Sequence, residues 1–372
     1  MSTSRTSHIA LAVAVFVILP NALTLSATGM PRPIQILAIT TPKAALGAAT
    51  MPTIVQRSHL ARHSSCSVRS GSSLSYHYPI KPFNRQHRIR GYFADPRTPS
   101  GKRSVFAPGA RGPFNFHSGV DILAADGTPV YSVVSGKTIA HPGNVKVYTT
   151  DGRRFQYYHI VPSVHSGQHV VAYKTVIGHI QAPHGHVHLI EVDGRTIQNP
   201  LAPGHLEPYR DKTAPVVDGV HFTGNQGLQA DPLRLNGVIH IAADTHDMPA
   251  LPIVGNWPGL GVTPAAVTWE LRSADGSVVV PSHMIVDFRR TEPGNKDFWK
   301  VFAVGTHQNK YGSKHVRRVT LVGLYSYNLT PSGLDTRTLS NGVYVLTVSA
   351  ADTCGNIGSL SAQITIANGK AA

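Results

Sequence analysis

The feature that most restricts the fold is a succession of short β-like runs, separated by turn residues, without a segment that keeps a helical period. Between Tyr78 and about Tyr209 the chain has runs such as HSGVDIL and HVHLIEV, each ended by turn residues. Asp151-Gly152 lies between two such runs and is a strong hairpin signal, and the segment 125–128 (ADGT) is a second turn. We therefore expect an all-β, antiparallel domain over residues 76–211.

A second β region follows the KTAP segment and extends over residues 212–372. Two of its segments, 236–244 and 341–352, resemble each other: both begin with Asn-Gly, alternate apolar residues and end in aspartate. Segment 341–352 is apolar on both faces, which predicts a central strand. The region resembles bacterial immunoglobulin-like or fibronectin-like modules, so we expect a C-terminal β-sandwich, with long loops at 250–266 and 289–315 as candidates.

The first 27 residues have the pattern of a secretory signal peptide. Arg5 precedes an apolar run of 11 residues, 9–19, and small residues follow up to Ala27. Because this run is shorter than the ~20 residues of a membrane-spanning helix, we expect export to a secreted, cell-wall or periplasmic location and no integral span after cleavage. Residues 28–75 are rich in Ser, Thr, Pro and Ala, and are expected to be a flexible linker or pro-segment.

Charge and cysteine content narrow the class of partner. The 34 Lys and Arg exceed the 19 Asp and Glu, and a net charge of +15 favours an anionic partner. Nucleic acid is not expected, because the chain has an export signal and does not interleave basic with aromatic residues. The two cysteines, Cys66 and Cys354, form no CxxC motif, which excludes a cysteine zinc site and leaves open whether they pair.

Three histidine-containing motifs lie within 72 residues: His117-Ser-Gly-Val-Asp121, His159 at the end of FQYYHI, and His186-Val-His188. Residues four apart on a strand are about 13 Å apart along its axis, so the first motif can converge on one metal only if the chain bends. A glycine inside the motif permits that bend. The last two histidines alternate, so both imidazoles project from the same face of a strand.

Together these motifs resemble the lysostaphin and LytM type of zinc metallopeptidases, which are murein endopeptidases. The resemblance covers about residues 79–205. The matching segments are H-x-x-x-D at 117–121, Y-x-H-L at 157–160, the strand and turn at 169–180, H-L-H-F-E at 186–191, and N-P at 199–200. Two departures are the QAPHG segment at 181–185, which replaces T-G-x-x-T-G-P, and Glu191, which is one residue further from the second histidine.

The resemblance implies a zinc peptidase domain of the duplicated hybrid motif type with one Zn²⁺ per chain. It implies that His117, Asp121 and His188 hold the zinc, as two imidazoles and a carboxylate do in catalytic zinc sites. It further implies that His159 and His186 are catalytic residues beside the activated water and the oxyanion.

The HGHVH segment contains two overlapping pairs, so His184 with His186 is the alternative to His186 with His188. The remaining histidines of this region are expected to be non-ligands. They are His141, His165, His169 and His179.

The expected function is that of an exported, monomeric zinc endopeptidase that hydrolyses peptide cross-links of bacterial peptidoglycan. The alternative is a non-catalytic protein on the same fold that binds the cell wall or activates a hydrolase. The segment 81–116 carries eight basic residues and one acid, and either holds an anionic wall polymer or is a solvated surface. The three tryptophans are dispersed and form no sugar-binding platform, so we expect the C-terminal domain to be a structural spacer.

Overall fold

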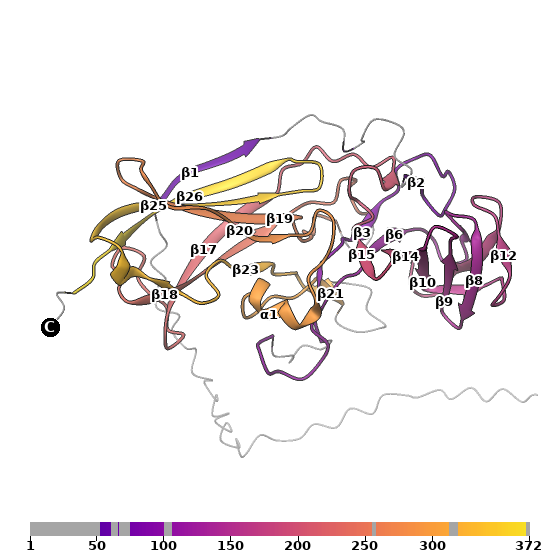
Figure 1. Ribbon diagram of the computed structural model, residues 1–372, viewed down its shortest axis with the longest axis horizontal. Helices are drawn as coiled ribbons and strands as arrows, with labels where there is room; N and C mark the ends of the chain where they lie inside the picture. The colour runs from indigo at the N-terminus through magenta and orange to yellow at the C-terminus, as the bar shows by residue number, and fades with distance from the viewer. Residues whose placement is uncertain are drawn as a thin grey trace, which may run out of the picture. The chain divides into compact units, whose positions relative to one another are not determined.

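The computed structural model describes residues 53–60, 66, 75–99, 106–254, 258–311 and 319–369. All of the described residues belong to one compact unit. Residues 1–52, which include the expected signal peptide, lie outside the described residues. The described chain is almost entirely β-structure, which confirms the all-β expectation (Figure 1). Its helical turns are α1 (Phe298–Val301), η1 (Asn295–Asp297) and η2 (Thr336–Thr338). None of the described helices is long and apolar enough to span a membrane.

The N-terminal half is built on an antiparallel sheet with a smaller three-stranded sheet beside it. The large sheet has the order β12 (His169–Val170), β8 (Gly136–His141), β9 (Asn144–Tyr148), β10 (Arg153–Tyr158), β14 (His186–Asp193), β6 (Val120–Leu123), β3 (Ile89–Gly91), with β15 (Thr196–Gln198) paired to β14. The small sheet has the order β11 (Ile160–Pro162), β13 (Val176–Ile180), β7 (Pro129–Tyr131). Two short pairs complete it: β2 (Tyr76–His77) with β16 (Leu206–Glu207), and β4 (Pro96–Arg97) with β5 (Asn115–Phe116).

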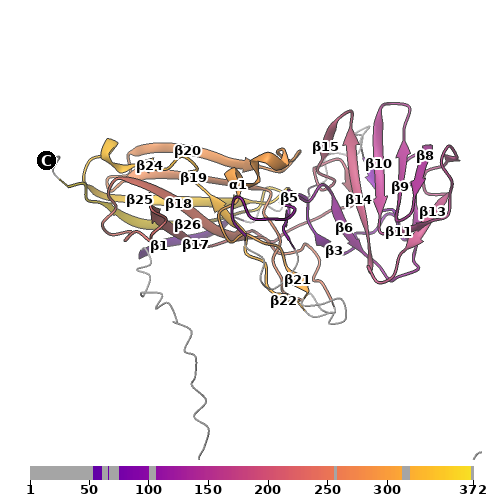
Figure 2. The ribbon, with the colours of Figure 1, turned by 90° about the horizontal axis from the view of Figure 1, so that it is seen from below.

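Both turns expected in this half are present. Strands β9 and β10 form an antiparallel hairpin around Asp151-Gly152, and Gly152 has φ +88°, a conformation that glycine adopts without strain. The second turn, between β6 and β7, is closed by a hydrogen bond from the Thr128 amide to the Ala125 carbonyl. Figures 1 and 2 show β3 and β6 on the side of the large sheet nearer to the C-terminal half.

The C-terminal half consists of two sheets that share one hydrophobic core (Figure 2). The five-stranded sheet has the order β1 (Thr53–Leu60), β26 (Ile357–Ile366), β25 (Gly342–Ala351), β19 (Ala266–Ser273), β20 (Val278–Asp287). The other contains β17 (Val216–Gly224), β18 (Val238–His246) and β23 (Ser326–Asn328), with β24 (Leu334–Asp335) paired to β18. A further pair is β21 (Lys310–Tyr311) with β22 (Val319–Leu321).

Strand β25 occupies the central position expected for segment 341–352. It lies between β26 and β19, but only one of its two apolar faces is buried: Leu346 and Val348 are fully buried, whereas Val343 is 38% exposed. The sheet therefore packs on a core from one side only, although the segment is apolar on both faces. Trp269 on β19 lies in that core.

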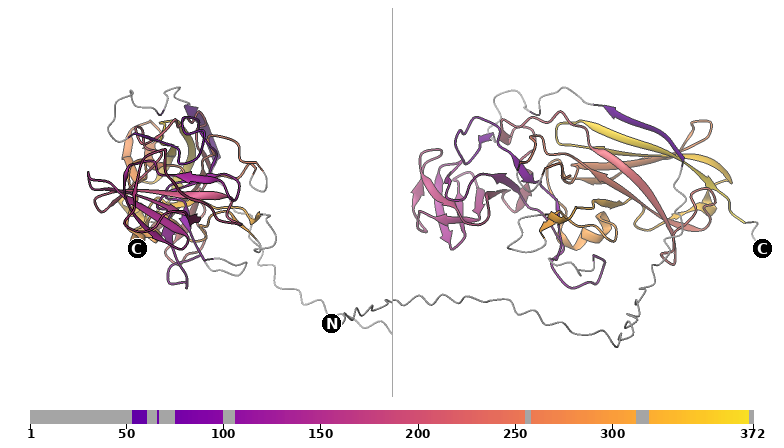
Figure 3. Two further views of the ribbon diagram at one scale, coloured as in Figure 1. Left: turned by 90° about the vertical axis from the view of Figure 1, so that its right-hand side faces the viewer. Right: turned by 180° about the vertical axis from the view of Figure 1, so that it is seen from behind.

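Part of the segment expected to be a linker is ordered in the fold. Within 28–75, residues 53–60 form β1, which pairs antiparallel with β26 at the edge of the five-stranded sheet (Figure 3). Composition does not exclude such a strand, because edge pairing depends on backbone hydrogen bonds. In the same segment Cys66 forms a disulfide with Cys354, and the two Cα atoms are 4.6 Å apart. The other residues of this segment up to position 74 lie outside the described residues.

Each half contributes side chains to the hydrophobic core of the other half. Phe93 and Phe116, from the N-terminal half, belong to the C-terminal core, whereas Val262 and Cys354 belong to the N-terminal core. The segment that carries Phe93 and Phe116 also contains the first histidine motif. The junction between the halves therefore positions the residues described next.

Candidate metal centre

A bend between two strands brings His117 and Asp121 together. His117 follows β5, Asp121 lies on β6, and the chain bends at Gly119 between them. A Cβ atom at Gly119 would lie 2.9 Å from the carbonyl carbon of Leu189 on β14, which is too close for any side chain. The bend that the spacing required is therefore present, and glycine permits the close approach of the two strands.

Strand β14 supplies two histidines from one face. His186 and His188 alternate along the strand, and His188 is the register partner of Asp121 on β6. On the opposite face of β14, Val187 and Leu189 are fully buried in the core and hold the strand in place. The imidazole of His188 is thereby fixed opposite the Asp121 carboxylate.

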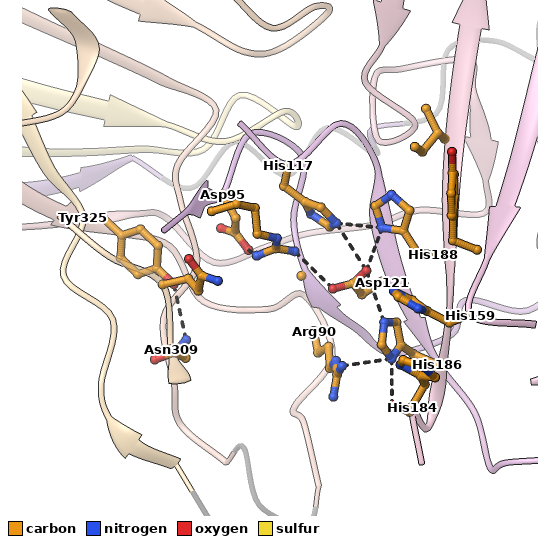
Figure 4. A pocket seen from close by; sticks show the side chains of 15 residues that line it. Arg90, Asp95, His117, Asp121, His159, His184, His186, His188, Asn309 and Tyr325 are labelled. Carbon is orange, nitrogen blue, oxygen red and sulfur yellow. Dashed lines mark hydrogen bonds and ion pairs between the residues drawn. The ribbon is translucent and has the colours of Figure 1, made fainter. Parts of the chain in front are cut away.

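The donor atoms of His117, Asp121 and His188 converge (Figure 4). His117 Nε2 lies 2.7 Å from His188 Nδ1 and 3.2 Å from Asp121 Oδ1, and His188 Nδ1 lies 2.8 Å from the same carboxylate oxygen. The three side chains are only 6%, 11% and 12% exposed, respectively. All three potential donors lie within 4.8 Å of one another.

Neighbouring groups orient these donors in the way a metal requires. His117 Nδ1 lies 2.7 Å from the Tyr92 carbonyl and donates to it, which leaves Nε2 with a bare lone pair. Asp121 Oδ2 accepts from Arg97 Nη2 at 3.2 Å, so that Oδ1 faces the histidines. Two imidazole nitrogens and one carboxylate oxygen are the donor set of a catalytic zinc site with one position left for water, and both His117 and Asp121 are held by a second partner. The residues present therefore fit a zinc ion.

The electrostatic surroundings favour the protonation states that bind metal. Burial, followed by the Arg97 guanidinium, lowers the pKa of His117 to about 3. Burial alone would raise the pKa of Asp121, but His117 and His186 outweigh it and hold that pKa well below its ordinary value. A neutral imidazole and an ionised carboxylate follow, and both are the forms that coordinate a cation.

His159 was expected to lie on a strand. It lies instead at the junction of β10 and β11. Its φ is +63°, in the left-handed region that histidine tolerates better than most residues and that is enriched at functional sites. Its ring stacks on His184, with centroids 4.1 Å apart, and lies 4.7 Å from the ring of His186. Burial, then His186 and His184, lowers the pKa of His159 to about 3.

His186 has two competing partners at one nitrogen. Its Nδ1 lies 2.9 Å from Arg90 Nη2 and 2.7 Å from the His184 carbonyl, while Nε2 lies 3.5 Å from Asp121 Oδ1. Nδ1 can accept from the guanidinium or donate to the carbonyl, but not both at once. In the first case Nε2 carries the proton and can donate it; in the second Nε2 is bare and can accept one. Burial lowers the pKa of His186 to about 4, against the opposing charge of Asp121.

These residues line a cavity of about 530 Å³ (Figure 4). One wall comes from the C-terminal half, through Gln308, Asn309 and Tyr325. The Tyr325 hydroxyl donates to the Gly261 carbonyl at 2.9 Å, and the Asn309 amide donates to the same carbonyl at 2.9 Å, so this wall is fixed. The C-terminal half, which was expected to be a structural spacer, supplies this part of the cavity wall.

The cavity contains residues that the sequence did not single out. Arg90 and Arg97 come from the basic segment 81–116 and lie in the cavity wall. The basic run was the available signal for them. No local pattern marks Gln308, Asn309 or Tyr325, because their position depends on packing between the two halves.

The four histidines expected to be non-ligands do not line this cavity, and each of them is exposed: His141, His165, His169 and His179. His184, from the alternative pair, reaches the cavity through its stacking on His159 but is not part of the three-donor cluster. Glu191, at the end of the H-x-H-x-x-E motif, is buried elsewhere and accepts hydrogen bonds from Tyr76 and His205.

No family model matches the chain, and no curated protein matches it. Several solved structures are similar to about a third of it. One is the catalytic domain of the antimicrobial peptidase lysostaphin from Staphylococcus simulans, at 23% identity over 31% of this chain and 90% of that chain, with a TM-score of 0.24. Another is the M23 metalloprotease pseudoalterin from the deep sea, at 17% identity over 37% of this chain and 82% of that chain, with a TM-score of 0.25. A third is a chain of the SpoIIIAH–SpoIIQ complex, at 20% identity over 34% of this chain and 98% of that chain, with a TM-score of 0.26.

Proposed function

We propose that this chain is an exported zinc-dependent endopeptidase that hydrolyses peptide cross-links of bacterial peptidoglycan. The observation that carries the proposal is the convergence of His117, Asp121 and His188 in one cavity, with His159 and His186 beside them. The order and spacing of the motifs that contain these residues resemble those of the lysostaphin and LytM type of peptidases. The basic charge of the chain suits an anionic wall polymer.

In this proposal His117, Asp121 and His188 hold the zinc. When bound, the zinc ion supplies an activated water and polarises the scissile carbonyl. Tyr92 and Arg97 keep the donor atoms in place through the carbonyl and guanidinium contacts described above. Loss of such supporting contacts typically weakens metal binding about 10–100-fold.

His159 and His186 move the protons. Their rings are 4.7 Å apart and both line the cavity, so each can exchange a proton with a group held between them and the metal ligands. The two proton arrangements available to His186 let the same Nε2 atom act as acceptor or as donor. Arg90, which contacts His186 Nδ1, selects between these arrangements.

The test is mass spectrometry of the fragments released from purified peptidoglycan by the full chain, with and without a chelator and after zinc is restored. We expect new amino termini from cleaved cross-links, loss of cleavage in chelator and recovery with zinc. His188→Ala is expected to lose both zinc and hydrolysis. His159→Ala is expected to keep zinc but to lose about 10²–10⁴-fold in turnover.

His141→Ala is the matched control, because His141 is exposed and does not line the cavity. It is expected to retain both zinc and hydrolysis. Binding of peptidoglycan without release of fragments, in a zinc-loaded chain, would overturn the proposal in favour of a non-catalytic wall-binding protein. Zinc loss in His159→Ala would instead make His159 a ligand and overturn the assignment of roles.

A further inference from the structure

Asp95 is a buried carboxylate in the wall of the cavity that contains the candidate metal centre (Figure 4). It does not belong to the cluster of three potential donors. Both of its oxygens have partners: Oδ1 accepts from the Thr263 amide at 2.9 Å, and Oδ2 accepts from the Tyr92 amide at 2.9 Å. Oδ2 also lies 3.8 Å from Arg97 Nη1. One side chain therefore connects the C-terminal half to the two residues that contact His117 and Asp121.

The contact with Tyr92 closes the turn that orients His117. In the turn 92–95 the Asp95 amide donates to the Tyr92 carbonyl at 3.2 Å, and the same carbonyl accepts from His117 Nδ1. Ala94, inside this turn, has φ +64°, a left-handed conformation that is unfavourable for alanine and persists only where surrounding contacts hold it. The Asp95 carboxylate supplies such a contact, because it accepts the amide of the first residue of the turn. The position of the Tyr92 carbonyl, and with it the orientation of the His117 ring, therefore depends on Asp95.

The contact with Arg97 acts on Asp121. The guanidinium lies between the two carboxylates, with Nη1 toward Asp95 and Nη2 donating to Asp121 Oδ2 at 3.2 Å. Because a guanidinium is a rigid planar fork, a charge that holds one of its nitrogens also fixes the direction in which the other donates. Asp95 thereby helps to fix the group that turns Asp121 Oδ1 toward the histidines.

The contact with Thr263 attaches Asp95 to the C-terminal half. Thr263 is buried, and its hydroxyl forms a hydrogen bond with the Tyr327 hydroxyl. The preceding residue, Val262, exchanges two backbone hydrogen bonds with Asp247, at 2.8 and 2.9 Å. The amide from which Asp95 accepts is therefore held in place by contacts within the C-terminal half.

We propose that Asp95 is a positioning residue of the metal centre, which holds the partners of His117 and Asp121 in place and joins them to the C-terminal half. The inference rests on the zinc ligands of the proposed function and adds a residue that is not itself a ligand. Contacts behind the ligands orient the donor atoms, and their loss typically weakens metal binding about 10–100-fold. In this role the C-terminal half supports metal binding as well as supplying a wall of the cavity.

The test is a zinc competition titration of the metal-free full chain, together with the absorption spectrum of the chain loaded with cobalt(II), which reports on ligand geometry. Asp95→Asn keeps the volume of the side chain but has one acceptor oxygen in place of two, so either the Tyr92 or the Thr263 amide faces an NH₂ group. We expect zinc binding to weaken about 10-fold in Asp95→Asn and up to about 100-fold in Asp95→Ala, with a changed cobalt spectrum in both. A residue that only stabilised the fold would leave the zinc affinity of the folded chain unchanged.

Asp352→Asn is the matched control, because Asp352 is also a buried aspartate with both oxygens in hydrogen bonds. It should keep the zinc affinity and the cobalt spectrum of the wild type. Wild-type values in folded Asp95→Asn would overturn the proposal, even if Asp95→Ala failed to fold. An equal loss of zinc affinity in Asp352→Asn would also overturn it, because the effect would then be a general loosening of the junction.

Arg97→Ala tests the route from Asp95 to Asp121. If Asp95 acts on Asp121 through Arg97, the double variant Asp95→Asn/Arg97→Ala should lose less zinc affinity than the product of the two single losses. A fully multiplicative loss would overturn this route. Weaker zinc binding in the Asp95 variants of a chain that releases no fragments from peptidoglycan would support this inference while contradicting the proposed function.

Discussion

Gly91 is the position where one added carbon atom most directly tests the candidate metal centre. It lies on β3 opposite Asp121 on β6. A Cβ at this position would overlap Asp121 Oδ2, and would lie 2.8 Å from Asp121 Cγ and 3.0 Å from Arg97 Nη2. Carbon atoms in contact prefer a separation of about 3.5–4.0 Å. In Gly91→Ala the carboxylate must therefore retreat by about 0.7 Å or more.

Metal sites tolerate much smaller displacements, of about 0.2 Å in a ligand distance. A retreat of this size breaks either the Asp121 bond to the metal or the Arg97 contact that orients it. We expect Gly91→Ala to weaken zinc binding by at least about 10–100-fold. Overpacking of the strand should also lower the free energy of unfolding of the metal-free chain by about 1–3 kcal/mol.

The assay is a competition titration of the metal-free chain against a chromogenic zinc chelator, together with urea unfolding of the same preparation. Gly224→Ala is the control, because a Cβ there would have its nearest neighbour 4.0 Å away, and it should bind zinc like the wild type. If Gly91→Ala binds zinc with wild-type affinity, Asp121 does not hold the metal in the position described here.

Two further predictions concern stability. Burial, opposed by a hydrogen bond from Ser118, raises the pKa of Glu292 to about 7. The wild-type chain should therefore lose stability as the pH rises from about 4.5 to 7, whereas Glu292→Gln should not. The difference in unfolding free energy between the variant and the wild type should increase by about 3 kcal/mol between pH 4 and pH 8. Urea unfolding at several pH values measures it, and a pH-independent difference would contradict the burial argument. Replacement of both Cys66 and Cys354 by serine should cost about 2–5 kcal/mol, since the disulfide closes a separation of 288 residues, and an unchanged thermal midpoint would show that it does not constrain the unfolded chain.

The core of the candidate site could be predicted because its motifs are local. The spacing from His117 to Asp121 required a bend, and the alternation of His186 and His188 required a shared strand face; the structure has both. A period of two along a strand is a property of a few consecutive residues. Such a property does not depend on how the rest of the chain folds.

The backbone at His159 could not be predicted in the same way. The run before it alternates like a strand, and β10 does end at Tyr158. The left-handed φ at His159 depends on the following turn into β11 and on the hydrogen bond that its carbonyl accepts from the Gln181 amide. Strand patterns give no information on a single residue at which the direction of the chain changes.

The contacts between segments that are distant in the chain could not be predicted from the sequence either. The composition of 28–75 suggests a spacer. A strand such as β1 can nevertheless form there by pairing with a free sheet edge, and this edge is provided by β26, about 300 residues later in the chain. Asp211, Asp247 and Asp352 form a buried aspartate cluster in which one carboxylate oxygen of each lies within 4.8 Å of the others. Each of them resembles an ordinary turn residue; Asp352, for example, accepts hydrogen bonds from the Cys354 and Asn356 amides. Their proximity results from the packing of the two halves.

The packing of the two halves against each other determines one wall of the cavity. The cavity has one wall that includes Tyr325, which is anchored to β18, and β18 ends beside the aspartate cluster. The cluster contains Asp352, two residues from the disulfide-bonded Cys354. The disulfide thus restrains the turn after β25, in which the Asp352 carboxylate also accepts from the Cys354 and Asn356 amides. A change that loosens this turn should alter the cavity wall from the C-terminal half before it alters Asp121 and His188, which are paired on neighbouring strands of the N-terminal half.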